Sequence, residues 1–269
     1  ARNAEKIEGN FVMTDLDLAH AAMEAAPDDD SARLRFYERL ADTELFMLLG
    51  AEAAGDQVTP ELFTIENQQF TLVFDRQERL SQFVGRTAPY AGLPGRALAE
   101  MLAGQGIGLA LNLEVAPSAM LIPAEAVDWL VQTLSNTPDE TEARLTEVSA
   151  PHVPEVVVTG LDRKLAIAGG LARFAYLAAA TYDDGATGHV LVFIDALPDA
   201  HRALASAASE ALTFSGIEAG VIDVLFIAAS DPLAAHLAKV GLRFDLPVPE
   251  APASPGAPGM DPANPPKLK

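Results

Sequence analysis

The sequence of 269 residues contains no cysteine. This absence excludes disulfide bonds, cysteine-ligated zinc and any thiolate nucleophile or persulfide carrier. Disulfides are rare in the reducing cytosol, so a chain without cysteine suits a cytoplasmic protein. The sequence also lacks an apolar run of the roughly 18 residues that a membrane-spanning helix needs. Its polar start up to Asn10 does not look like a signal peptide. We therefore expect a cytoplasmic protein. Met13 offers a native start, which leaves open whether residues 1–12 are native.

Basic residues are few: 18 lysines and arginines stand against 38 acidic residues, which gives a formal charge of −20. Such a surface repels phosphate backbones and anionic lipid headgroups, so we expect neither nucleic acid nor a membrane as partner. A basic protein or a cationic ligand suits this field, although solubility alone also explains the charge. The expected partner is a protein or a small polar ligand, and the sequence leaves the oligomeric state open.

Recognisable catalytic and cofactor motifs are also lacking. The five histidines form no i, i+4 pair, so no metal site is predicted. The glycine-rich loop Gly104–Gly108 follows an expected helix and precedes an expected strand, which reverses the order of a dinucleotide-binding loop. No serine occupies a Gly-x-Ser-x-Gly elbow. The sequence therefore predicts no catalytic residue, no metal and no cofactor.

The sequence does contain enough apolar residues, 49% of the chain, for a sizeable core, and its length favours two domains. The first half centres on Phe36–Leu49, where a helix ends and passes directly into a strand. That strand, Glu44–Leu49, is continuously apolar after its first residue, which predicts burial on both faces. An α+β domain, a mixed sheet with flanking helices, is therefore expected over residues 14–136. Its other expected strands are 62–65, 70–74, 109–113 and 120–122.

The second half begins after a polar, acid-rich stretch, Thr137–Ala150, which we interpret as the domain boundary. Its elements follow the order βαββαβ, which is typical of ferredoxin-like folds, and predict a second domain over residues 151–245. Residues 246–269 are rich in proline and alanine, which predicts a disordered tail. The expected elements are strand 156–159, helix 162–173, strands 174–182 and 189–194, helix 199–213 and strand 221–228.

Three aspartates are the candidate ligand-binding acids. Asp75 and Glu78 have the spacing of a helix N-cap and its reciprocal partner, but the same spacing would also serve a catalytic carboxylate pair. Asp195 ends an expected strand. Asp223 interrupts an apolar strand, where an unpaired charge is costly. It is explained by an edge position on the sheet, or by a partner such as Arg173 in a cleft.

Several segments resemble the SseB family, whose name refers to enhanced serine sensitivity. The resemblance covers about Leu16 to Phe244 and rests on the order of the segments. One position departs from the family pattern, because Asn112 is followed by Leu113–Glu114 where the family usually turns with proline and glycine. The N-terminal segments are FYERLADTELFMLL, VFDRQERL, LPGRALAEML, GIGLALN and IPAEAVDWL, and the C-terminal ones are ARFAYLAA, HVLVFID, VIDVLFIAA and KVGLRF.

The resemblance implies an N-terminal and a C-terminal SseB domain and brings no catalytic activity, cofactor or site residues with it. We expect a non-catalytic cytoplasmic protein that binds or regulates a partner, in preference to an enzyme. The alternative hypothesis is an enzyme that acts on a small amino-acid-like substrate with acids such as Asp75, Asp195 or Asp223. A purely structural subunit of a larger assembly is a third hypothesis.

Overall fold

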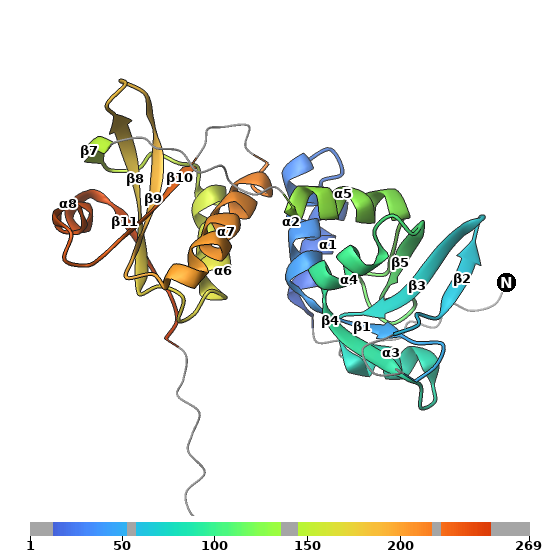
Figure 1. Cartoon of the computed structure of the whole chain (residues 1–269). Helices are drawn as coiled ribbons and strands as arrows, with labels where there is room; N and C mark the ends of the chain where they lie inside the picture. The colour runs from blue at the N-terminus through green and yellow to red at the C-terminus, as the bar shows by residue number, and fades with distance from the viewer. Residues whose placement is uncertain (1–12, 53–57, 136–144, 217–221, 249–269) are drawn as a thin grey trace, which may run out of the picture. The chain divides into compact units, whose positions relative to one another are not determined.

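The computed structural model describes residues 13–52, 58–135, 145–216 and 222–248, and Figure 1 shows the chain. It divides into two compact units. The first comprises Ala1–Glu142, Val153–Leu161 and Ala205–Val221, and the second comprises the remaining residues. The predicted domain bounds, 14–136 and 151–245, stay predictions. Residues 1–12 and almost all of the predicted tail lie outside the described residues.

The first unit is built on a mixed sheet. In the described residues six strands have the order β4-β1-β3-β5-β6, with β2 paired to β3 beside β1. Only β3 and β5 are parallel neighbours; the other pairs are antiparallel. The strands are β1 (Glu44–Leu48), β2 (Leu62–Ile65), β3 (Gln68–Phe74), β4 (Tyr90–Pro94), β5 (Ile107–Leu111) and β6 (Met120–Ile122).

Helices cover both faces of this sheet. Four of them pack their apolar residues against one face, and α3 packs against the other. Alternate residues of β1 enter the two cores, Leu45 and Met47 the first and Leu48 the second, which confirms the predicted burial of this strand on both faces. The helices are α1 (Asp15–Ala25), α2 (Asp30–Asp42), α3 (Gln77–Val84), α4 (Gly95–Leu102) and α5 (Ala124–Leu134).

One buried hydroxyl in this core has no hydrogen-bond partner. Thr71 lies in the middle of β3, fully buried, and its Oγ1 is unpaired. Because an unpaired buried hydroxyl keeps its desolvation cost, Thr71→Val is expected to raise the free energy of unfolding by up to about 1 kcal/mol. Urea unfolding followed by fluorescence of Trp129, the single tryptophan, measures it. The control is Thr43→Val, which deletes a hydroxyl that donates to the Arg39 carbonyl at 2.7 Å and should destabilise. A destabilised Thr71→Val chain would contradict the prediction.

The second unit is built on a second mixed sheet. Its strands are ordered β10-β9-β8-β11, and β7 also pairs with β8. The pair β9–β10 is parallel, and the others are antiparallel. The strands are β7 (Leu145–Ser149), β8 (Phe174–Tyr182), β9 (Thr187–Ile194), β10 (Ile222–Ile227) and β11 (Leu242–Asp245). The helical segments of the second unit are the 3₁₀ turn η1 (Pro198–Ala200) and α8 (Pro232–Val240). The division between the two units runs through α6 (Glu155–Ala166) and α7 (His201–Thr213).

Two separate mixed sheets confirm the α+β class, but the ferredoxin-like topology is not confirmed. In a split βαβ unit another strand separates the first strand from the one that follows its helix. Here β7 pairs directly with β8 and is antiparallel to it. The predicted strand 156–159 is wrong, because these residues form the first turns of α6. Their apolar residues follow a helical spacing, with Val157, Leu161 and Leu165 buried. The first strand of this sheet is instead β7, which lies inside the stretch Thr137–Ala150 that we interpreted as the domain boundary.

No helix in the part of the chain that the structure describes is long and apolar enough to span a membrane.

Candidate functional site

A buried polar cluster lies where the parallel strands β3 and β5 end. Its members come from the start of α1, the two strand ends, α3 and the loop before β6. We call it the Arg79 cluster, and it consists of Thr14, Asp17, Asp75, Arg79, Asn112 and Ser118.

Arg79 is the centre of this cluster. Its Nη1 donates to Asp75 Oδ1 at 2.7 Å and to Asp17 Oδ1 at 3.1 Å. Its Nη2 donates to Asp17 Oδ2 at 2.5 Å. The Arg79 side chain is only 5% exposed, and the two carboxylates are more deeply buried still. One guanidinium therefore neutralises two carboxylates away from water, and it joins α1 to α3 and the end of β3.

Hydroxyl and amide groups complete the hydrogen bonding around the two acids. Thr14 Oγ1 donates to Asp75 Oδ2 at 2.6 Å, and Ser118 Oγ donates to Asp17 Oδ1 at 2.5 Å. Thr14 also caps α1, with a capping box to Asp17. Burial raises the pKa of Asp17, but the hydrogen bonds from Arg79 and Ser118 outweigh it and lower the pKa from 3.8 to about 2. Asp17 thus stays ionised.

This low pKa makes the stability of the fold depend on pH. Between about pH 4 and pH 2 the unfolded chain binds a proton at Asp17 that the folded chain does not bind. The contribution of Asp17 is therefore complete above about pH 4 and is lost as the pH falls toward 2. We expect an NMR titration of its carboxyl carbon to give a pKa of about 2 in the intact chain, and a higher value in an Arg79→Met variant. A carboxyl that titrates at its ordinary value in the intact chain would contradict the prediction.

The capping interpretation of Asp75 is wrong. The N-cap of α3 is Arg76, which makes no side-chain capping bond, and the Asp75 carboxylate bonds Arg79 and Thr14 instead. The Asp75 side chain is only 1% exposed, whereas Glu78 lies on the exposed side of α3. The two acids therefore do not form a pair that faces a cleft.

Asn112 and Asp195 fasten the ends of the two parallel strand pairs in the same way. Each follows a strand with a positive φ, 48° for Asn112 and 51° for Asp195. The Asn112 N–H donates to the Val73 carbonyl, and its Oδ1 accepts from the Asp75 N–H. The Asp195 N–H donates to the Ile227 carbonyl, and its Oδ1 accepts from the Ala229 N–H at 2.8 Å. Asp195 thus has a structural role, because it ties the end of β9 to the end of β10.

The other two predicted site residues, Arg173 just before β8 and Asp223 on β10, do not form one group. Arg173 Nη1 lies 4.0 Å from Asp195 Oδ2, in an exposed contact. Asp223 is on β10, at the end of the strand order, which agrees with the edge position considered from the sequence. Its carboxylate accepts a hydrogen bond from the Tyr182 hydroxyl, so its partner is not Arg173. Burial raises the pKa of Tyr182, and the hydrogen bond to Asp223 raises it further.

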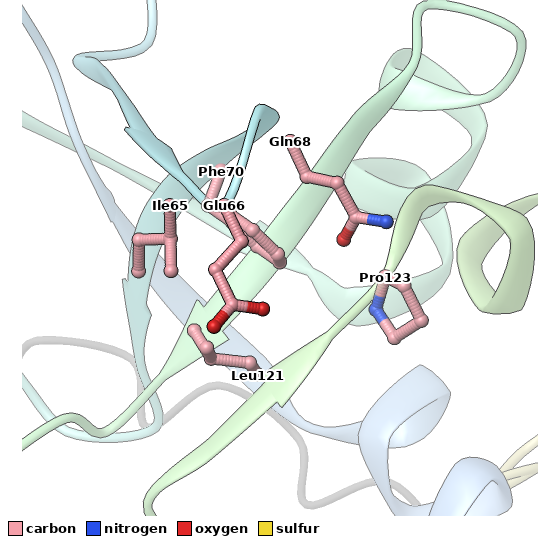
Figure 2. Close-up of a pocket in the computed structure, with 6 residues that line it drawn as sticks. All are labelled: Ile65, Glu66, Gln68, Phe70, Leu121 and Pro123. Atoms are coloured by element: carbon pink, nitrogen blue, oxygen red, sulfur yellow. The ribbon is translucent and has the colours of Figure 1, made fainter.

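A shallow depression lies on the α3 face of the first sheet, between the β2–β3 hairpin and β6. Its volume is about 220 Å³, below the roughly 300–1,000 Å³ of sites for drug-sized ligands. Figure 2 shows the Glu66 carboxylate reaching from the hairpin toward Leu121, and the Gln68 amide pointing toward Pro123. No local sequence pattern indicates this depression, because the residues that line it are far apart in the chain. The lining residues are Ile65, Glu66, Gln68, Phe70, Leu121 and Pro123.

In the described ranges of the chain, no three histidine or acidic side chains lie close enough together to hold a metal ion.

Comparison with protein families matches residues 18–129 to the SseB protein N-terminal domain. The match runs from α1 to α5, so it includes the depression and most of the Arg79 cluster. Comparisons with curated proteins and with solved structures found no match. The resemblance seen in the N-terminal segments is confirmed, and that of the C-terminal segments stays a prediction.

Proposed function

Because residues 18–129 are an SseB N-terminal domain, we propose that this chain is a non-catalytic cytoplasmic member of the SseB family that binds or regulates a partner protein. The proposal is supported by the interactions that the buried and strand-end aspartates make within the fold. Asp17 and Asp75 hold Arg79, Asp195 holds the end of β10, and Asp223 holds Tyr182. Each of these carboxylates already has a partner in the fold.

The alternative, an enzyme for a small amino-acid-like substrate, would need Asp75, Asp195 or Asp223 at an accessible polar pocket. Asp75 is buried in an ion pair. The depression that the structure does contain is lined by none of the three and is mostly apolar. We therefore favour binding over acid–base chemistry.

Affinity capture with the full chain tests the proposal. The immobilised protein is exposed to a lysate of its own cells at low and at moderate salt, beside an unrelated folded protein of similar negative charge. We expect a stoichiometric partner that the control protein does not retain. Less of it should remain at moderate salt, because salt screens the attraction between a chain of charge −20 and a basic partner. The absence of a stoichiometric protein or metabolite in both conditions would refute the proposal.

A further inference from the structure

We propose that the depression between the β2–β3 hairpin and β6 takes a large apolar side chain of a partner protein, with a lysine or arginine of the same segment against Glu66. This inference rests on the proposed binding function and names its site. The occupant is a basic segment with apolar residues, and three observations support that choice.

The first observation is the shape and chemistry of the lining. Ile65, Phe70, Leu121 and Pro123 provide apolar walls, and only Glu66 and Gln68 bring polar groups. Leu121 is 38% exposed on a short strand at the edge of the sheet, so it offers apolar area that a partner can bury. A space of about 220 Å³ suits one large side chain better than a drug-sized molecule.

The second observation is that the fold builds this surface from a specific glycine. Gly108 on β5 pairs with Phe70 on β3. A Cβ at Gly108 would lie 2.7 Å from the Phe70 ring and 2.5 Å from the Ile122 carbonyl oxygen. Because position 108 has no side chain, the Phe70 ring lies against β5, stacked with Phe63 at 6.3 Å. In Figure 1 the turn end of this hairpin lies away from α3. Phe70 is only 3% exposed, so its ring lines the depression as a buried aromatic wall that is fixed in place.

The third observation is the charge around the depression. The segments that supply its walls, residues 58–72 and 105–125, contain four glutamates and neither lysine, arginine nor histidine. Glu66 points into the depression itself. A cationic group beside the apolar side chain is therefore the complementary partner. A second copy of this chain, also at −20, and a nucleic acid would both meet electrostatic repulsion.

Selection from a displayed library of short random peptides, with the full chain as bait, tests this inference. We expect the enriched peptides to carry a lysine or arginine next to a large apolar residue. Leu121→Ser should weaken their binding roughly tenfold, because it removes apolar area from the contact. Glu66→Gln should weaken it about threefold at low salt, because it removes an exposed ion pair.

Matched control variants separate this surface from the rest of the molecule. Leu242→Ser replaces a leucine that is 39% exposed on β11 of the second unit, and Glu100→Gln removes an exposed glutamate of α4. Both should bind the selected peptides as the unmodified chain does, and all four variants should give the native thermal unfolding curve. The proposal would be overturned if the enriched peptides lacked a basic residue, or if the Leu121→Ser chain bound them as tightly as the unmodified chain does. It would also be overturned if the unmodified chain enriched no peptides beyond those that the Leu121→Ser chain enriches.

The same variants distinguish this inference from the proposed function. If the Leu121→Ser bait captures a stoichiometric partner from the lysate as well as the unmodified bait does, the depression is not the docking surface. The binding function then stands. If neither bait captures a partner, the proposed function fails together with the site that rests on it.

Discussion

Replacing Arg79 by methionine is expected to lower the free energy of unfolding of the first unit by about 3–5 kcal/mol, since it strands two buried carboxylates without their cation. Asp17 and Asp75 both lie within hydrogen-bonding distance of this guanidinium, and neither is open to water. Methionine keeps much of the side-chain volume, so the loss reports the charge and its hydrogen bonds and not a cavity.

Urea unfolding followed by Trp129 fluorescence measures this loss, because the single tryptophan belongs to α5 of the first unit. The control is Arg33→Met. Arg33 also pairs with an aspartate, Asp30, at 2.8 Å, but its side chain is 56% exposed. Exposed pairs contribute about 0–1 kcal/mol, so this variant should remain close to the unmodified chain. An Arg79→Met chain that is destabilised no more than the Arg33→Met chain would show that the cluster is not required for the fold.

Most strands of the first sheet were predictable from the sequence because their signals are local, but β4 (Tyr90–Pro94) was not predicted. The strands 62–65 and 120–122 are found as predicted, and β1 follows its helix directly. Each is a short apolar run between clear turn residues. The second half was less predictable. Val156, Val157 and Val158 are β-branched and suggested a strand, but the helical spacing of Val157 and Leu161 decided the outcome.

The candidate sites show more clearly what short sequence patterns cannot predict. Asp75 and Glu78 fit a capping pattern four residues long, yet the partner that decides the role of Asp75 is Thr14, 61 residues away, together with Arg79. The sequence departs from the usual SseB turn at Leu113–Glu114, and Asn112 just before it accepts a hydrogen bond from the Asp75 N–H at the end of β3. Glu66 and Leu121 line one depression from positions 55 residues apart by their numbers. Only the pairing of β3, β5 and β6 brings them together.

Replacing Gly95 by alanine is expected to destabilise the first unit by about 3 kcal/mol, because the added methyl group has no room. Gly95 begins α4, and its N–H donates to the Thr43 carbonyl at 2.8 Å. A Cβ at this position would lie 1.8 Å from the Leu40 carbonyl oxygen and 2.9 Å from the Leu40 carbonyl carbon. These atoms belong to the backbone of α2, so relief requires the two helices to move apart.

Whether Gly95→Ala destabilises or stabilises the fold tests the packing directly, because helix propensity alone predicts that alanine stabilises it. In an unpacked helix, alanine is more favourable than glycine by about 1 kcal/mol. Gly50→Ala is the matched control: its nearest neighbours would lie 3.9 Å from the new methyl group, and it should stay within about 0.5 kcal/mol of the unmodified chain. Both variants are measured by urea unfolding with Trp129 fluorescence. If Gly95→Ala proves neutral or stabilising, α4 does not pack on α2 through its first residue. The close contact then fails as the reason for glycine in the LPGRALAEML segment.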